Sequence, residues 1–168
     1  MKNIKTTLLI FILAVIALIG CSGSEIESQA IIEDIVLNKS TYQDIENILP
    51  NMSPGYHLDE TGKFMVIEEG VYYTDYTINN IDGNLMLIFD IDSDVLAGVR
   101  FAPKDKSKEY GDSLKTWLFN KYTNYEQTTK DTGFVFSNGV ENVELYITEN
   151  PKDSNKYYGL YIEWSIQE

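Results

Sequence analysis

After residue 30 the spacing of apolar residues alternates between steps of three and four, as in helices, and steps of two, as in strands. In Thr41–Leu49 the apolar residues share one helical face, and Pro50 ends the pattern. Ser40 and Gln43 fit a capping box at the start of this predicted helix. In Tyr110–Tyr122 apolar residues recur at steps of three and four, which predicts the longest helix of the chain.

Short apolar runs separated by turn sequences predict the strands. The pairs Asp82-Gly83 and Asn138-Gly139 are favoured in tight turns, whereas Asn51–Gly55 is a turn-rich loop. Connections this short require antiparallel pairing. We expect strands at Phe64–Ile67, Val71–Ile78, Leu85–Ile91, Val95–Phe101, Phe134–Phe136, Val143–Thr148 and Tyr157–Ile166.

The order of these elements predicts a single α+β domain over residues 31–168. Its antiparallel β-meander sheet should carry two amphipathic helices packed on one face, because each helix must bury its apolar side. The order also fits two similar helix-plus-meander halves, although no residue-level repeat is convincing. We expect Trp117 on the long helix and Trp164 on the last strand to lie in the core.

The first twenty-one residues have the layout of an export signal, with a basic start and an apolar run. The run Leu8–Ile19 is shorter than the ~20 residues needed to span a bilayer. Leu18-Ile19-Gly20-Cys21 resembles the lipobox of bacterial lipoproteins. The resemblance implies that residues 1–20 are a signal peptide and that Cys21 carries a diacylglycerol and often a further acyl chain such as palmitate. A free Cys21 after an ordinary secretory signal is the alternative.

Residues 21–30 are small and polar, which predicts a flexible tether that keeps the domain close to a membrane. In the lipoproteins of double-membraned bacteria, Asp after the lipidated Cys favours the inner membrane. Ser22 stands at this position, so the resemblance implies the outer membrane in such a source. In a source with one membrane it implies the outer face of the cytoplasmic membrane.

The charge balance argues against nucleic acid as a partner. Lys2 and Lys5 lie in the leader, so 11 of the 13 basic residues remain against 26 carboxylates, a net charge of −15. The chain has one Cys and one His, which excludes an internal disulfide, a Cys-based zinc site and a His-rich metal site. No cofactor is expected.

An acidic turn and a single histidine are the remaining candidates for chemistry. Asp90, Asp92 and Asp94 have the spacing of a calcium loop, but Val95 stands at its glycine position and Phe101 at its closing glutamate position. We interpret them as an acidic hairpin turn, with weak Ca²⁺ binding as the alternative. His57 is the only imidazole that could act as a base, and no nucleophile-elbow motif accompanies it.

The last two predicted strands place tyrosine and glutamate on the face away from the core. Alternation in Tyr157–Ile166 points Tyr158, Leu160 and the other even-numbered residues inward and the odd-numbered residues outward. Rigid tyrosine rings within an acidic rim would suit a basic protein partner, although the rings could instead only shield the sheet. The candidate binding residues are Glu144, Tyr146, Tyr157, Tyr161 and Glu163.

The segment Leu37–Pro50, with the strands after it, is similar to small envelope lipoproteins of the SmpA/OmlA type and to repeats of the β-lactamase-inhibitor-protein-like fold. The resemblance implies a non-catalytic protein that binds other envelope proteins. We therefore expect a lipid-anchored scaffold or accessory component. An inhibitor of a basic secreted hydrolase such as a lysozyme-like enzyme is the alternative, followed by an enzyme that uses carboxylates or His57.

Overall fold

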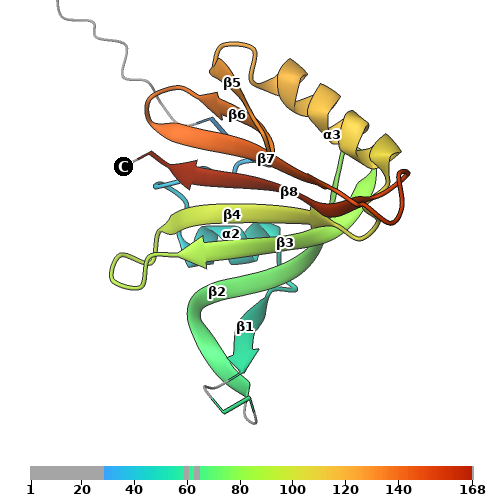
Figure 1. The fold of residues 1–168 in the computed structure, drawn as a ribbon. Coiled ribbons are helices and arrows are strands. Elements are labelled where there is room, and N and C mark those ends of the chain that lie inside the picture. The colour runs from blue at the N-terminus through green and yellow to red at the C-terminus, as the bar shows by residue number, and fades with distance from the viewer. Residues whose placement is uncertain (1–28, 59–60, 63–64, 168) are drawn as a thin grey trace, which may run out of the picture.

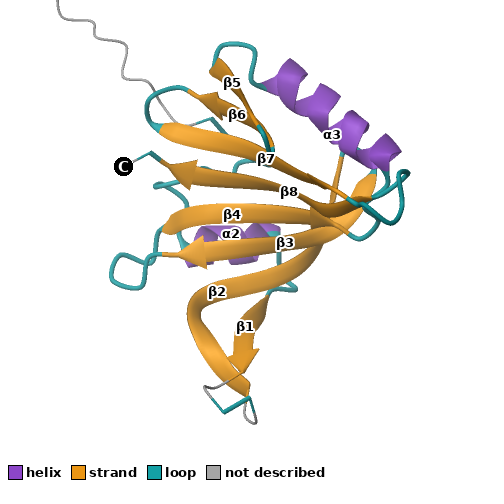
Figure 2. Ribbon diagram, in the orientation of Figure 1, coloured by secondary structure: helices purple, strands orange, loops and turns teal. Residues whose placement is uncertain are grey.

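One antiparallel sheet forms the body of the molecule in the computed structural model (Figure 1). The structure describes residues 29–58, 61–62 and 65–167, which are mostly strand (Figure 2). The two described helices are α2 (Tyr42–Ile48) and α3 (Lys108–Lys121). The strands are β1 (Ser53–Leu58), β2 (Met65–Ile78), β3 (Ile81–Phe89), β4 (Leu96–Pro103), β5 (Glu126–Lys130), β6 (Gly133–Ser137), β7 (Glu141–Glu149) and β8 (Tyr157–Ile166).

The strand order is β1-β2-β3-β4-β8-β7-β6-β5, and every neighbouring pair is antiparallel. Each helix is followed by a four-stranded meander, and the two meanders join through their last strands, where Val99 of β4 pairs with Trp164 of β8. The predicted antiparallel meander with two helices is therefore confirmed. The second meander has four strands where the sequence predicts three.

The structure merges two predicted strands into one. The sequence predicts separate strands at Phe64–Ile67 and Val71–Ile78, but β2 runs without a break from Met65 to Ile78. Gly70 has φ +73°, and a Cβ there would lie 2.7 Å from the backbone oxygen of Phe89. Gly70 therefore supports an irregularity inside one long strand instead of a reversal of the chain.

The cap of α2 lies one residue later than predicted. The backbone N–H of Thr41 donates to the Asp44 carboxylate at 3.0 Å, and the Asp44 N–H donates to the Thr41 hydroxyl at 3.3 Å. The Thr41 N–H and the Thr41 hydroxyl both donate to the Asp44 carboxylate, and these two bonds lower its pKa from the usual range. Ser40 is instead buried, where its hydroxyl accepts from the Val36 N–H at 3.0 Å. The predicted Ser40/Gln43 pair is therefore wrong.

A single hydrophobic cluster forms the core. Trp164 is fully buried in it, as expected, whereas Trp117 is only partly buried and packs at its margin. The expectation of a core position for Trp117 is wrong because the ring lies where α3 meets solvent, with the Lys121 ammonium 5.3 Å from its centroid. The cluster includes Ile45 of α2 and its C-cap Leu49, Leu114 and Leu118 of α3, and Leu87, Val99, Phe101, Val143, Leu145, Leu160 and Ile162 of the sheet.

Candidate functional site

The register of three strands brings most of the predicted binding residues together. Tyr146 of β7 pairs with Tyr161 of β8, and Glu144 pairs with Glu163. On its other side Glu163 pairs with Arg100 of β4. Tyr161 lies between the buried Leu160 and Ile162, so its ring points to the face opposite the core. We name Arg100, Glu144, Tyr146, Tyr161 and Glu163 the tyrosine cluster.

Three side chains of the tyrosine cluster form a stack. The rings of Tyr146 and Tyr161 lie 4.6 Å apart between centroids, with 17° between their planes. The guanidinium of Arg100 lies 4.8 Å from the centroid of Tyr161 on this stack. A cation against an aromatic face and an offset ring pair each stabilise by about 0.5–1.5 kcal/mol. The stack therefore holds the two rings in one orientation.

Each glutamate of the tyrosine cluster forms an ion pair with a basic side chain. Arg100 donates to Glu163 Oε2 from Nε at 2.8 Å and from Nη2 at 2.5 Å. Lys130 of β5 lies 3.3 Å from Glu144. The side chains of Arg100 and Glu163 are 41% and 38% exposed, so a partner could reach them. The centre of this surface is therefore aromatic and nearly neutral, which differs from the free acidic rim that the sequence predicts.

Burial raises the pKa of Tyr161, while the positive charge of Arg100 opposes the shift. The phenol therefore stays protonated at neutral pH and can donate or accept a hydrogen bond.

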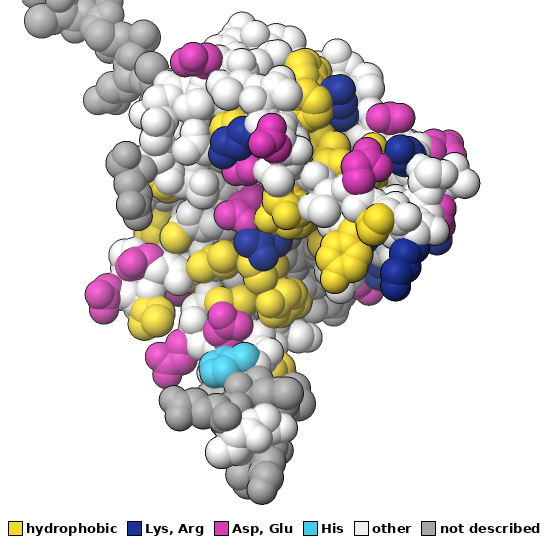
Figure 3. All heavy atoms as spheres, viewed as in Figure 1, with side chains coloured by type: hydrophobic (Ala, Val, Ile, Leu, Met, Phe, Trp, Pro, Cys, Tyr) yellow, Lys and Arg dark blue, Asp and Glu magenta, His cyan; other side chains and the backbone are white. Residues whose placement is uncertain are grey.

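Figure 3 shows the surface in the orientation of Figure 1, in which α2 lies behind β3 and β4 and the opposite face of these strands is towards the viewer. Hydrophobic side chains gather in the middle of this surface, with acidic and basic side chains among them.

Tyr157 does not join the tyrosine cluster, which corrects the sequence prediction. The β7–β8 register shifts between Thr148 and Glu149, so that Gly159 pairs with Thr148 but Tyr157 pairs with Glu149. The bulge inserts Tyr158 as an extra residue and reverses the side on which Tyr157 points.

The bulge gives Tyr157 and Tyr158 opposite environments. The Tyr157 ring lies against Gly111 of α3, where a Cβ would come within 2.4 Å of it. Tyr158 was expected inside but is 75% exposed. The bulge thus moves one tyrosine onto the helix and turns its neighbour out to solvent.

The aspartates of the acidic turn do not converge on a metal site. Among the described residues no group of three or more His, Cys, Asp or Glu side chains is placed to hold an ion. Asp90 Oδ1 accepts from the backbone N–H of Ser93 at 2.8 Å and from its hydroxyl at 2.7 Å. These bonds lower the pKa of Asp90. Its carboxylate therefore closes the turn that also contains Asp92 and Asp94.

His57 is exposed on β1, the outermost strand of the first meander, where it pairs with Val66. The hairpin of β1 and β2 extends away from the rest of the sheet (Figure 1). The neighbouring Asp59 and Glu60, like the predicted lipidation residue Cys21, lie outside the described residues. The structure places His57 far along the sheet from the tyrosine cluster, with three strands between β1 and β8.

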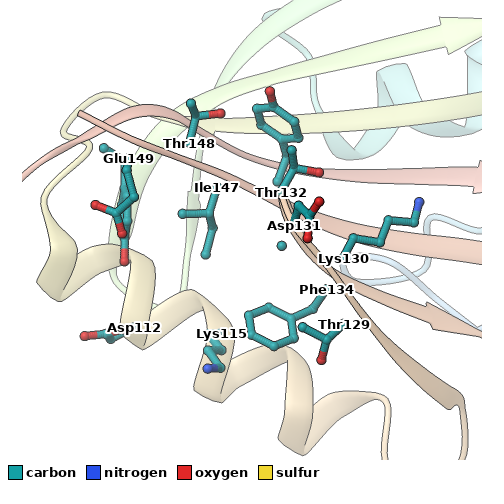
Figure 4. Close-up of a pocket in the computed structure, with 13 residues that line it drawn as sticks. Asp112, Lys115, Thr129, Lys130, Asp131, Thr132, Phe134, Ile147, Thr148 and Glu149 are labelled. Carbon is teal, nitrogen blue, oxygen red and sulfur yellow. The ribbon is translucent and has the colours of Figure 1, made fainter. Parts of the chain in front are cut away.

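A cleft of about 530 Å³ lies between α3 and the adjoining ends of β6 and β7 (Figure 4). Phe134 and Ile147 supply apolar lining, and Asp112, Lys115 and Glu149 supply charge. The Lys115 ammonium lies 4.3 Å from the centroid of Phe134, on one side of this lining. Among the residues that the structure describes, no His or Cys lines the cleft. Sequence reasoning missed the cleft because α3 and β7 are not adjacent along the chain.

Sequence reasoning also missed Arg100. Its position opposite Glu163 depends on the pairing of β4 with β8, and the two residues are 63 positions apart in the sequence.

Comparison of the chain with protein-family models, with curated proteins and with solved structures finds no match. Within the described residues, no helix has the length and apolar character needed to cross a membrane.

Proposed function

We propose that the chain is a lipid-anchored cell-envelope protein that binds a protein partner without catalysis, as a scaffold or accessory component. The observation that carries the proposal is the stacked arrangement of Arg100, Tyr161 and Tyr146 on the sheet. Tyr and Arg are enriched among residues that contribute most to protein binding. Rings that are already held in place lose little conformational freedom when a partner arrives.

The proposal includes both helices on one face of the sheet. Membership of one core cluster supports this placement, because Ile45 of α2 and Leu114 of α3 lie in it with Leu87 and Leu145 of the strands. The opposite face, which carries the tyrosine cluster, would then be free for a partner. An antiparallel sheet commonly buries one face and leaves the other in water.

The charge of the chain favours a basic partner. The residues after the leader carry a net charge of −15, which would steer a positively charged protein towards the domain. The two glutamates of the tyrosine cluster, however, are already neutralised by Arg100 of the cluster and by the neighbouring Lys130. Charge should therefore mainly speed the encounter, while the aromatic contact determines how long the complex lasts.

Anchoring rests on the leader sequence. Leu18-Ile19-Gly20-Cys21 has the lipobox pattern, and two or three acyl chains would hold the protein at a membrane, since each buried CH₂ contributes ~0.8 kcal/mol. A partner in or near the same membrane would then be met at high local concentration.

The test compares partner capture by the wild-type chain and by Tyr146→Ala/Tyr161→Ala. Each chain is expressed in full length, and the envelopes of the expressing cells are solubilised in mild detergent for affinity capture. We expect the double variant to lose a reproducible partner while its melting temperature stays within a few degrees. Tyr158→Ala is the matched control, because Tyr158 is a more exposed tyrosine on the same strand outside the cluster. Equal capture by all three chains would contradict the proposal.

Inhibition of a basic secreted hydrolase is the second candidate, and the net charge of −15 is the observation that favours it. Assays of lysozyme-like cell-wall hydrolases with added protein distinguish the two. Inhibition that saturates at one chain per enzyme, and that the Tyr146→Ala/Tyr161→Ala variant loses, would favour the inhibitor over the scaffold.

A further inference from the structure

A buried carboxylate lies at the start of β7, where neither the tyrosine cluster nor the cleft uses it. Glu141 is 1% exposed, and its Oε1 accepts the backbone N–H of Gln29 at 3.0 Å. The hydroxyl of Tyr125 donates to the same oxygen. Glu141 Oε2 is buried, and none of the described residues donates a hydrogen bond to it. This carboxylate therefore joins the first described residue of the chain to the second meander.

A second bond ties the same part of the chain to α3. The ammonium of Lys121 donates to the backbone oxygen of Ile31. Farther along, Ile31, Ile35 and Leu37 are almost fully buried, and the Ile31 N–H donates to Ile35 O at 2.8 Å. Residues 29–37, which we name the N-terminal arm, thus precede the first helix but are bonded to the second half of the fold.

Stability alone is a poor reason for a carboxylate at this position. Burying a charge costs free energy, and an apolar side chain of similar volume is often as stabilising or more so. An apolar side chain could not accept the N–H of Gln29, however. The Glu141 carboxylate is needed only to fix Gln29 at the end of the N-terminal arm, because the burial of Ile31, Ile35 and Leu37 already holds the rest of the arm.

We propose that Glu141 is a clasp that fixes Gln29 to the second meander and so sets the point at which the preceding chain leaves the domain. The inference goes beyond the proposed function and holds whether or not Cys21 carries lipid. Gln29, which the sequence assigns to the tether 21–30, is thus hydrogen-bonded to the domain.

The clasp selects one end of the molecule. Glu141 pairs with Ile166 at the end of β8, whereas Glu149 and Tyr157 mark the opposite end of these two strands. Gln29 is therefore held at the end away from the β7–β8 turn. In an anchored protein this turn would point away from the membrane, and the tyrosine cluster, halfway along β7 and β8, would present itself sideways to neighbours.

The experiment measures amide hydrogen exchange by NMR in the full-length chain and in two variants. In Glu141→Leu, the Gln29 amide should exchange at least about tenfold faster, whereas the amides of Ile35 and Leu145 should keep their protection. Glu144→Leu is the matched control, because Glu144 lies on the same strand with its side chain on the opposite face. This control should leave Gln29 unchanged.

A readout on the wild-type chain needs no variant. After correction for intrinsic rates, the Gln29 amide should exchange more slowly than the Ala30 amide, which donates no hydrogen bond to any residue of the described part of the chain. Faster exchange at Gln29 than at Ala30 would overturn the clasp. So would unchanged Gln29 exchange in Glu141→Leu, or a loss of protection at Leu145 as large as that at Gln29.

Discussion

The indole N–H of Trp164 donates to the hydroxyl oxygen of Tyr122 at 2.7 Å inside the core. Trp164 lies on the last strand and Tyr122 caps the C-terminus of α3, and both are almost fully buried. The bond satisfies a donor that has no access to water, and it fixes α3 against β8. A buried polar pair of this kind specifies one packing of helix on sheet.

Replacement of Tyr122 by Phe should destabilise the protein by about 1–3 kcal/mol, because the buried indole N–H would lose its acceptor. Urea unfolding followed by circular dichroism measures the change. The same replacement in a Trp164→Phe background should cost much less, since no indole donor remains there. An equal cost in both backgrounds would show that the hydrogen bond contributes nothing beyond packing.

The two tryptophans should differ in their contribution to stability. Trp164→Ala removes a fully buried ring and should cost about 3–5 kcal/mol. Trp117→Ala removes a ring that is only partly buried, so about 1–2 kcal/mol is expected. Denaturant titration of both variants gives the comparison. A larger loss at Trp117 would mean that the buried side of α3 has been assigned wrongly.

The sequence predicts well the elements that bury one side. β8 has the predicted bounds Tyr157–Ile166. β3 was expected at Leu85–Ile91 but spans Ile81–Phe89, with alternating burial. The predicted turn at Asp82-Gly83 is wrong, because this pair lies inside β3 and the chain reverses at Asn79-Asn80, which both have positive φ. β5 could not be found in this way, because all five residues of Glu126–Lys130 are exposed and no alternation exists. β1 escaped detection because Pro54 and Gly55, which favour turns, lie inside it.

The tyrosine cluster was predictable only within one hairpin. Alternation in β7 and β8 placed Tyr146 and Tyr161 on one face, because both strands are regular at those positions. The bulge at Tyr158 has no sequence signal that separates it from a regular strand, so Tyr157 was assigned to the wrong face. Arg100 depends on a pairing between the two meanders, which alternation within one strand cannot reveal.

The position of Tyr157 leads to a prediction at Gly111. Gly→Ala inside a helix ordinarily stabilises by roughly 0.5–1 kcal/mol. In α3, however, the new Cβ would lie 2.4 Å from the Tyr157 ring, so Gly111→Ala should destabilise by about 1–3 kcal/mol. Thermal unfolding measures the sign.

Removal of the ring supplies the control for Gly111. In a Tyr157→Ala background the clash is absent, and Gly111→Ala should then stabilise by roughly 0.5–1 kcal/mol. A raised melting temperature in the single variant Gly111→Ala would show that Tyr157 does not pack against α3.

Stability should fall at alkaline pH because of the buried phenols. Burial raises the pKa of Tyr122 far above its usual range, although the bond from Trp164 opposes the shift. Burial and the contact with Glu141 likewise raise the pKa of Tyr125. Above about pH 10 the unfolded chain loses these protons while the folded chain keeps them, so the free energy of unfolding decreases as pH rises.

Comparison with a variant isolates the contribution of Tyr122. Burial lowers the pKa of Lys121, so this residue acts in the opposite direction, but it does so in both chains. Urea unfolding from about pH 9 to about pH 11 should give a shallower decline for Tyr122→Phe than for the wild type. Equal slopes would show that the Tyr122 phenol ionises as readily in the folded state as in the unfolded chain.

The leader sequence gives the last prediction, which concerns Cys21. Cells that express the full-length chain and are grown with labelled palmitate should incorporate label into the wild type and not into Cys21→Ser. The variant should also leave the membrane fraction, because the run Leu8–Ile19 is shorter than the ~20 apolar residues that span a bilayer. Ser22→Ala is the matched control and should be labelled like the wild type. If Cys21→Ser still takes up label and stays membrane-bound, the lipobox interpretation is wrong.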